Sequence, residues 1–471
     1  MTITEIVDKL NGFAWGPLML VLLVGTGVYL SIQTHFLQFR KFGYTIKNTF
    51  GKAIRNNEAN EGELSPFQAL TTALAATVGT GNIAGVAGAI TVGGPGAIFW
   101  MWVSALFGMV TKYAEVVLAL HYREKNEKGD YVGGPMYYIK NGLGKNFHWL
   151  ATLFCIFGAL AAFGIGNMTQ VNTIANAINN MFVSFGFNPN TASFSLFGQV
   201  VPITSIIIGV ITAILVGLVL LGGIKRIGQV TEKMVPAMAV IYVICALLVI
   251  VLNIHHIPSI FVSIIQGAFS AEAALGGAFG ITIMMTIQKG IGRGVFANEA
   301  GLGSAPMAHA ISAEQDPVKQ GLYGIFEVFM VSFVICTLTA FVLMCGYKSG
   351  VSVAWGQSSS ADLVSTCMGT ILGNKLASLI ITISITLFAL STLLTWSLYG
   401  TRCYEYLFGQ ATSKFYQIIF IGTVVIGACL KLDLVWTIAE MLNGFMAIPN
   451  LIALITLSPV VFKLTKKYFN E

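Results

Sequence analysis

Long apolar runs follow one another along most of this chain, and each is long enough for a helix rather than a buried strand. Eleven runs hold the roughly 20 mainly apolar residues that one helix needs to cross a bilayer. They do not alternate at every second position, as the strands of a membrane β-barrel do. We therefore predict an all-α polytopic membrane protein with about 11 transmembrane helices. The predicted spans are residues 15–32, 66–92, 96–121, 147–183, 203–223, 232–253, 264–293, 321–346, 373–408, 415–430 and 436–463.

Composition supports a membrane chain. Of the 471 residues, 55% are hydrophobic and 10% are charged, whereas soluble domains carry about 25% charged residues. A single soluble core stops growing at about 250–300 residues, so this much apolar sequence requires lipid as its solvent. Before the first run, Glu5 and Asp8 stand beside Lys9. A signal peptide would be basic there, so we expect a short interfacial helix instead.

Lysine and arginine are distributed unequally between alternate connections. With the C-terminus placed inside, the inner connections hold 21 of these residues, among them Lys289 and Arg293, and the outer connections hold four. Because positively charged connections stay in the cytoplasm, we predict a multi-pass protein of the cytoplasmic membrane, with the N-terminus outside and the C-terminus inside. The net charge of +6 then reflects topology, and we expect no nucleic-acid partner.

The chemically reactive residues form no catalytic or cofactor motif. The seven cysteines are scattered, without a C-x-x-C pair, and the sequence contains no catalytic triad, phosphate-binding loop or zinc motif. We therefore expect neither enzymatic activity nor a cofactor. Lys112 and Glu115 are spaced to form an ion pair on one helix. Near the predicted cytoplasmic boundary stand Arg293, Glu299, His309 and Glu314, which we expect to be solvated, with a gate network as the alternative.

Glycines interrupt the second predicted span, at "ATVGTGNIAGVAG" (residues 76–88). Glycine costs a helix interior about 1 kcal/mol relative to alanine. "GTGNIA" formally fits a dinucleotide-binding fingerprint, but that motif needs an acidic residue about 20 positions on, where this chain has Trp102. Close helix packing through Gly81 and Gly85 is another explanation. Two flexible and two polar residues within Gly79–Asn82 favour a break in the helix.

A second glycine cluster lies in the seventh predicted span, at Gly276, Gly277 and Gly280. It follows the first cluster by five spans, so its helix would enter the membrane from the opposite side. Paired interruptions at corresponding positions point to the midplane site of an inverted-repeat transporter. We therefore divide the chain into three parts. These are residues 1–65 (N-terminal segment, first helix and loop), 66–256 (first repeat) and 257–471 (second repeat and short tail).

Four segments of the sequence resemble the alanine or glycine:cation symporter family. They are "GGPGAIFWMWVSALFG" (93–108), "GTGNIAGVA" (79–87), "GIGNMTQVNTIA" (164–175) and "FANEAGLGSAP" (296–306). The resemblance implies a LeuT-like fold, a 5+5 inverted repeat preceded here by one extra helix. It also implies a secondary symporter that imports small neutral amino acids, such as alanine and glycine, with sodium by alternating access.

An amino acid would present a carboxylate and an ammonium group to such breaks. Free N–H groups at a half-helix N-terminus suit the anion, and free carbonyls at a half-helix C-terminus suit the cation. We expect the carboxylate on the backbone amides of Thr80 and Gly81, and the ammonium near the carbonyls of the second cluster. Gln170 is either a substrate contact or an interhelical hydrogen-bond partner. The predicted substrate site is Thr80, Gly81, Asn82, Gln170, Gly277, Phe279, Gly280, Thr282 and Trp396.

Trp396 is expected to close the pocket against Phe279 and so to limit side-chain size, although ordinary packing would also explain a tryptophan there. By the resemblance, sodium would lie among carbonyls and hydroxyls, because no acidic residue stands at either predicted break. The alternative is that these hydroxyls bond carbonyls of their own helix. The predicted sodium ligands are Ala75, Val78, Phe388, Ser391 and Thr392.

Other functions remain as alternatives. Proton coupling or a broader amino-acid specificity is the first. A channel would more naturally be a symmetric assembly of short subunits, and a sensor would be expected to carry an output domain. The predicted partners are therefore a small neutral amino acid, sodium and the lipid bilayer, with no obligatory protein partner.

Overall fold

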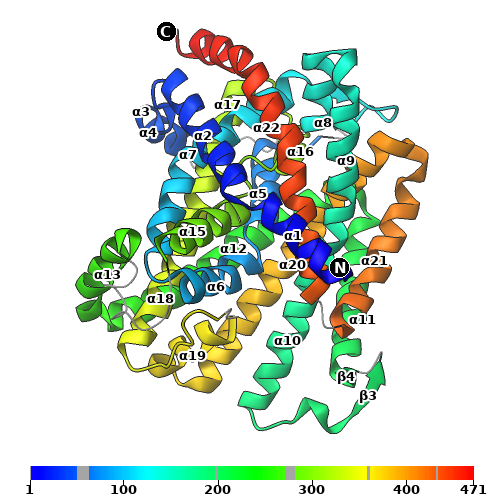
Figure 1. Ribbon diagram of the computed structural model, residues 1–471. Helices are drawn as coiled ribbons and strands as arrows, with labels where there is room; N and C mark the ends of the chain where they lie inside the picture. The colour runs from blue at the N-terminus through cyan, green and yellow to red at the C-terminus, as the bar shows by residue number, and fades with distance from the viewer. Residues whose placement is uncertain are drawn as a thin grey trace.

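The computed structural model describes residues 2–49, 63–196, 199–270, 282–357, 361–430 and 433–470, which are mostly helical (Figure 1). Among these residues, nine helical stretches are long and apolar enough to cross a membrane, and one bent pair would make a tenth. The prediction of an all-α polytopic membrane protein is therefore confirmed, and the number eleven stays a prediction. The Gly276–Gly280 cluster lies outside the described residues.

The elements follow in chain order, with η marking short 3₁₀ or π segments. The first part contains α1 (Ile3–Ala14), α2 (Pro17–Gln33), α3 (Leu37–Arg40), α4 (Phe42–Asn48), α5 (Pro66–Thr77), η2 (Thr80–Asn82), α6 (Ala84–Gly93), α7 (Ala97–His121), β1 (Glu124–Lys125), β2 (Tyr131–Val132), α8 (Pro135–Tyr138), η3 (Ile139–Leu143), η4 (Lys145–Phe147), α9 (His148–Phe163), η5 (Gly164–Met168), α10 (Thr169–Ser184), η6 (Pro189–Thr191), β3 (Ser193–Leu196), β4 (Gln199–Pro202), α11 (Ile203–Leu220) and α12 (Gly223–Leu252). The second part contains η7 (Ile254–His256), α13 (Ile257–Phe269), α15 (Ile283–Asn298), α16 (Pro306–His309), α17 (Pro317–Val328), η8 (Phe329–Cys336), α18 (Thr337–Lys348), α19 (Ala361–Leu372), α20 (Asn374–Phe408), η9 (Gln410–Thr412), α21 (Ser413–Cys429) and α22 (Asp433–Phe469). The strands form two antiparallel hairpins, β1–β2 and β3–β4.

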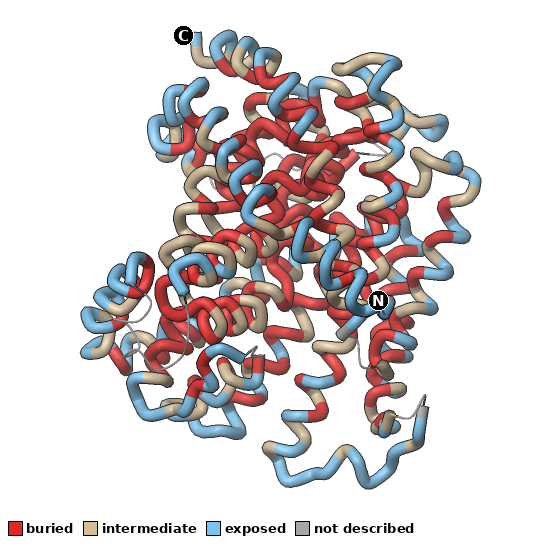
Figure 2. Tube along the Cα trace, viewed as in Figure 1, coloured by how far each residue is buried: buried red, intermediate tan, exposed pale blue. Residues whose placement is uncertain are grey.

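Burial follows the expectation for a helical bundle in lipid. Figure 2 shows buried chain through the middle of the molecule and exposed chain on its outer helices. Large apolar side chains are nevertheless exposed on those outer helices, including Val21 of α2, Leu218 of α11, Ile244 of α12 and Ile418 of α21. A soluble protein would bury most of such surface. In a membrane it faces hydrocarbon, so these helices mark the lipid-facing side of the bundle.

The first predicted break is confirmed. Helix α5 begins at a capping box, in which Ser65 Oγ accepts from the Gln68 amide at 3.1 Å, and it ends at Thr77. After the break the chain resumes as η2 and α6, bent by 60° from α5. Asn82 fixes the conformation of the break, because its Nδ2 donates across it to the Thr77 carbonyl at 2.7 Å.

A second break, which the sequence analysis did not identify, lies between α15 and α16. The backbone of Glu299 has φ 54°, and Gly301 and Gly303 have φ 89° and 83°. A left-handed conformation cannot continue an α-helix, and glycine adopts it without a steric cost. The segment "AGLGSAP" carries the same Gly-x-Gly pattern as Gly79–Gly81, and that pattern is the signal that could have located this break.

The two broken helices lie side by side and run in opposite directions. Helix α15 starts beside the end of α6, where Thr286 Oγ1 donates to the Gly93 carbonyl at 2.7 Å. Helix α15 packs along α6, and the short α16 packs on α5. The two interruptions therefore face each other in the interior of the bundle.

This direction corrects the assignment of Lys289 and Arg293 to the inner side. Arg293 forms a 2.9 Å ion pair with Glu440, which lies near the beginning of α22. The far end of α22 carries the basic pair Lys466 and Lys467. Lys289 and Arg293 therefore lie on the opposite side of the bundle from those lysines, because α15 runs towards the interior from the α6 side.

The second break generates a first prediction, since it requires glycine at position 303. A Cβ there would lie 2.6 Å from Pro135 Cγ and 2.9 Å from Phe154 Cε2. Adding the cost of positive φ, about 1–2 kcal/mol, to overpacking of about 1–3 kcal/mol, we expect Gly303→Ala to lower the melting temperature of the purified protein in detergent. Gly25→Ala is the control, because a Cβ at Gly25 meets nothing within 4 Å. Equal melting of the two variants would contradict the described packing.

Candidate functional site at the two helix breaks

A small cavity lies between the two breaks. Its volume is about 20 Å³, which is enough for water and too little for an amino acid. Five parts of the chain form its wall: α5 and the first break, the η5–α10 region, the end of α15 with the second break, α20 and α22. The lining residues are Ala76, Thr77, Gly79, Gly81, Asn82, Ile165, Gln170, Phe296, Ala297, Glu299, Thr392, Trp396 and Asn443.

Backbone amides of the first break are available at this cavity. Thr80 and Gly81 are the first two residues of η2, and the first N–H groups of a helix have no acceptor within it. Gly81 and Asn82 line the cavity, and Thr80 is buried next to them. The predicted amide pair is thus placed where an anionic group could be bound at a helix N-terminus.

Gln170 joins the first break to α10. Its Oε1 accepts from Thr80 Oγ1 at 3.0 Å, and its Nε2 donates to the Ile165 carbonyl at 2.8 Å. The π segment η5 directly precedes α10 and brings Ile165 into this position. The interhelical hydrogen bond expected of Gln170 is therefore confirmed. Gln170 also lines the cavity, and its contact with a substrate stays a prediction.

The predicted sodium ligands gather where α5 ends beside α20. Ser391 Oγ lies 3.1 Å from the Ala75 carbonyl and 2.8 Å from the Phe388 carbonyl. Thr392 Oγ1 lies 3.2 Å and 2.9 Å from the same two oxygens. Val78, which directly follows α5 as its C-cap, is also buried. The hydroxyls thus bond carbonyls of their own helix, as the alternative expected, and also reach across to α5.

These groups form an oxygen-only cluster. Hard cations such as sodium prefer oxygen ligands, as calcium and magnesium do. Over the described stretches of the chain, no three His, Cys, Asp or Glu side chains gather in a way that would hold a metal ion. A Cβ at Gly79 would lie 2.7 Å from Thr392 Oγ1, so glycine allows the first break to approach this cluster closely.

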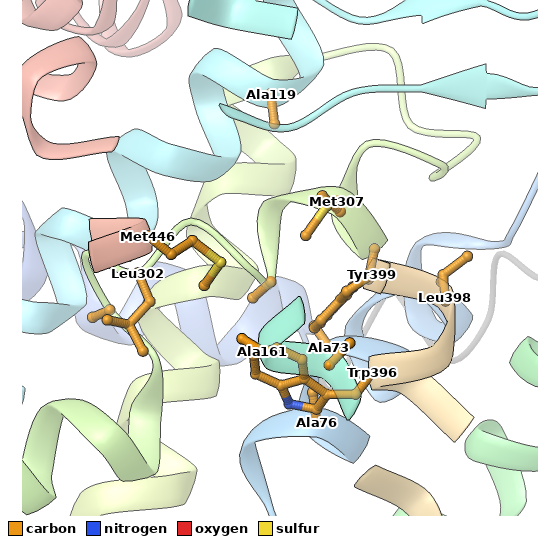
Figure 3. Close-up of a cluster of buried hydrophobic side chains, with 14 of the residues drawn as sticks. Ala73, Ala76, Ala119, Ala161, Leu302, Met307, Trp396, Leu398, Tyr399 and Met446 are labelled. Atoms are coloured by element: carbon orange, nitrogen blue, oxygen red, sulfur yellow. The ribbon is translucent and has the colours of Figure 1, made fainter. Parts of the chain in front are cut away.

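Trp396 lies one turn beyond the cluster and is buried. In Figure 3 its indole ring lies beside Ala73, Ala76 and Ala161. Glycine is required opposite it, since a Cβ at Gly166 would lie 2.1 Å from Trp396 Cβ. The indole is therefore held rigidly at the cavity wall.

The prediction that Glu299 is solvated at the membrane boundary is wrong. Instead of being solvated, its side chain is buried, lines the cavity and accepts a 3.1 Å hydrogen bond from Trp396 Nε1. Its second carboxylate oxygen accepts from Ser304 Oγ. The left-handed conformation of Glu299 ends α15 and turns the chain inward. An acidic residue therefore stands at the second break, whereas the two breaks predicted from the sequence contain none.

Lys112 and Glu115 do not form the expected ion pair. Lys112 Nζ lies 3.5 Å from Glu327 of α17, with both side chains fully buried. Glu115 Oε1 instead accepts from the amides of Gly301 and Gly303 at 3.1 Å each. The amides of the second break need an acceptor, and Glu115 supplies it in preference to pairing along its own helix.

His309 is also buried rather than solvated. Its Nε2 lies 3.1 Å from Glu327 Oε2, and its Nδ1 lies 2.9 Å from Gln320 Nε2. Helix α16 is thereby attached to α17 on the side away from α15.

One of the predicted substrate residues, Thr282, lies away from the cavity, and three others cannot be placed relative to it. Gly277, Phe279 and Gly280 lie outside the described residues. Thr282 caps the N-terminus of α15, where its side chain accepts from the Met285 amide and is exposed. The 16 residues of α15 separate it from the second break by about 24 Å, so the structure does not bring Thr282 together with the other predicted residues.

A larger, polar cavity of about 820 Å³ lies on the α6 side of the breaks. Helix α10 contributes a stripe of Asn172, Thr173, Asn176 and Asn180 to its wall, and the Arg293–Glu440 pair also lines it. Amide and hydroxyl groups at this spacing favour water over lipid. The cavity therefore presents a polar surface beside α6, the helix that follows the first break.

Comparison with known proteins identifies the chain. The model of the sodium:alanine symporter family matches residues 1–471. The sodium/alanine symporter AgcS of Methanococcus maripaludis is 45% identical, covering 100% of this chain and 98% of its own. An uncharacterized transporter of Haemophilus influenzae is 43% identical, covering 100% and 97%. The probable sodium/glutamine symporter GlnT of Bacillus subtilis is 36% identical, covering 99% and 91%.

The match extends over the whole length, and it agrees with the apolar helices and the site at the breaks. The prediction of a multi-pass membrane transporter rather than an enzyme is therefore confirmed. The chain belongs to the sodium:alanine symporter family.

Proposed function

We propose that this protein is a sodium-coupled symporter that imports small neutral amino acids, such as alanine and glycine, by alternating access. The observation that carries the proposal is that hydrogen-bond donors for an anion and oxygen ligands for a cation lie next to each other at the first break. The amides of Thr80 and Gly81 begin η2, and the oxygen cluster around Ser391 lies where α5 ends. The printed names of AgcS and GlnT support an amino acid carried with sodium.

The substrate carboxylate binds the amides at the start of η2 in this proposal. A helix N-terminus carries partial positive charge and free donors. Gln170 positions Thr80 through the 3.0 Å hydrogen bond between their side chains. The side-chain amide of Asn82 donates to the Thr77 carbonyl. Asn82 therefore stabilises the conformation of the break and does not contact the ligand.

Sodium binds among the carbonyls of Ala75, Val78 and Phe388 and the hydroxyls of Ser391 and Thr392. The ion then joins α5 to α20, and it stabilises the arrangement that also holds the η2 amides in place. Sodium and amino acid would each strengthen the binding of the other by the same factor, because linkage is reciprocal.

The cavity of about 20 Å³ corresponds to a closed site, so the substrate enters only after the walls separate. The polar cavity between α6 and α10 is the outer entrance, consistent with a chain whose N-terminus lies outside and C-terminus inside. The antiparallel broken helices support a LeuT-like 5+5 repeat after one extra helix. Eleven spans in all remain part of the proposal, of which the described residues contain nine, or ten with the bent pair.

The direct test is uptake of radiolabelled alanine and glycine into proteoliposomes, with and without an inward sodium gradient. We expect accumulation that requires the sodium gradient. Uptake driven equally well by a proton gradient alone would favour the proton-coupled alternative, and accumulation of many larger amino acids would favour broader specificity.

A second prediction concerns the sodium ligands. Thr392→Ala removes one oxygen of the cluster but leaves the amides of η2 unchanged. We expect the sodium concentration for half-maximal alanine binding to rise about tenfold or more, with alanine affinity recovering at high sodium.

The matched control for this variant is Thr395→Ala. Thr395 Oγ1 also donates from α20 to an α5 carbonyl, that of Thr72 at 3.1 Å, but it is not one of the proposed ligands. If Thr392→Ala lost alanine binding to the same degree at every sodium concentration, the assigned cation site would be wrong.

A third prediction concerns side-chain size. Trp396 forms part of the cavity wall, so Trp396→Ala should make room for larger substrates and let leucine compete with alanine. Competition assays measure this directly. Trp102→Ala is the control, because the indole of Trp102 bonds Thr337 Oγ1 at 2.8 Å and does not line the cavity. Unchanged exclusion of leucine by the Trp396 variant would refute the size filter.

A further inference from the structure

The cavity contains a buried carboxylate for which the proposed function gives no role. Glu299 is 4% exposed and lines the same cavity as Gly81 and Thr392. We infer that Glu299 binds the ammonium group of the substrate, so that the protein selects amino acids over other small carboxylates. This inference rests on the proposed function.

The balance of buried charges supports a cationic ligand at Glu299. A buried charge is costly unless it is paired and hydrogen-bonded. Lys112 lies within 3.5 Å of Glu327, which accounts for one carboxylate. Glu115 accepts on Oε1 from two backbone amides and from Asn450 Nδ2 at 2.6 Å, and hydrogen bonds of this kind favour the charged form of a carboxylate.

Glu299 differs from Glu327 in having no cation at ion-pair distance, and it has one hydrogen-bond donor fewer than Glu115. Its two hydrogen-bond donors are the indole of Trp396 and the hydroxyl of Ser304, and both are neutral. Among the ion pairs of the described residues, none includes Glu299. Of these three buried carboxylates, Glu299 is therefore the one that lines the cavity and has no cation in direct contact.

The position of Glu299 suits one end of a zwitterion. It directly follows the C-terminus of α15, where the helix dipole is negative and favours a cation. The amides of Thr80 and Gly81 stand at a helix N-terminus, which favours an anion. Gly81 and Glu299 line the same cavity, so a single α-amino acid that enters when the walls separate would place its carboxylate at the first break and its ammonium at the second.

Glu299→Gln tests the inference, because it removes the charge with little change in shape. Tryptophan fluorescence of the purified protein, in saturating sodium, would report binding of alanine and of lactate. Lactate keeps the carboxylate and the methyl group but replaces the ammonium with a hydroxyl. We expect the dissociation constant for alanine to rise about ten- to a hundredfold, while that for lactate stays unchanged or falls. The preference for alanine over lactate should thus drop at least tenfold.

Two further variants keep the test sharp if the glutamine variant folds poorly. Ser304→Ala removes a neutral donor from Glu299 and keeps the charge, so the preference for alanine over lactate should be retained even if the affinity for both ligands changes. Glu299→Asp keeps the charge, but the shorter side chain moves the carboxylate away from the ammonium by one methylene. Alanine binding should therefore weaken, while lactate binding does not improve.

Three outcomes would overturn the inference. The first is equal weakening of alanine and lactate by Glu299→Gln, which indicates a structural role. The second is recovery of alanine affinity at higher sodium, which indicates that Glu299 binds a sodium ion. The third is unchanged alanine affinity. Failure of the wild-type protein to bind alanine in sodium would instead count against the proposed function itself.

Discussion

Backbone hydrogen bonding at membrane depth is the constraint on which the rest of this structure depends. A break in a transmembrane helix leaves N–H and C=O groups that lipid cannot satisfy. Side chains from neighbouring helices supply the partners. Thr339 Oγ1 donates to the Asn82 carbonyl at the first break, and Glu115 accepts from the Gly301 amide at the second. Each break is therefore tied to an intact helix beside it, α18 in one case and α7 in the other.

The same requirement explains the buried charges on the side of α16. Asn450 donates to Glu115, and Tyr138 donates to Asn450, so the second break is joined to α22 and α8. Lys112, on α7, lies against Glu327 of α17. Breaking such a buried pair by removing one partner costs about 3–5 kcal/mol. These contacts make the region behind the second break one connected polar unit.

Local sequence information was sufficient wherever one segment decided the outcome. The long apolar runs specified helices, because only a helix satisfies its own backbone in lipid. The cluster Gly79–Asn82 specified a break, since glycine and polar residues both weaken a helix there. The hydroxyls of Ser391 and Thr392 were also located correctly beside Ala75, but that expectation came from the family resemblance rather than from the residues alone.

Tertiary structure decided everything that depended on which elements meet. The position of Glu299 in the sequence predicts a solvated side chain at the membrane boundary. The left-handed turn after α15 instead buries this side chain against Trp396. Lys112 and Glu115 are well spaced for a pair on one helix, yet a facing carboxylate and the amides of a distant break compete for them. The sequence by itself therefore determined the solvent, the helices and the first break, because these depend on neighbouring residues. The partners of the buried charges are set by packing between segments far apart in the chain, which no local pattern records.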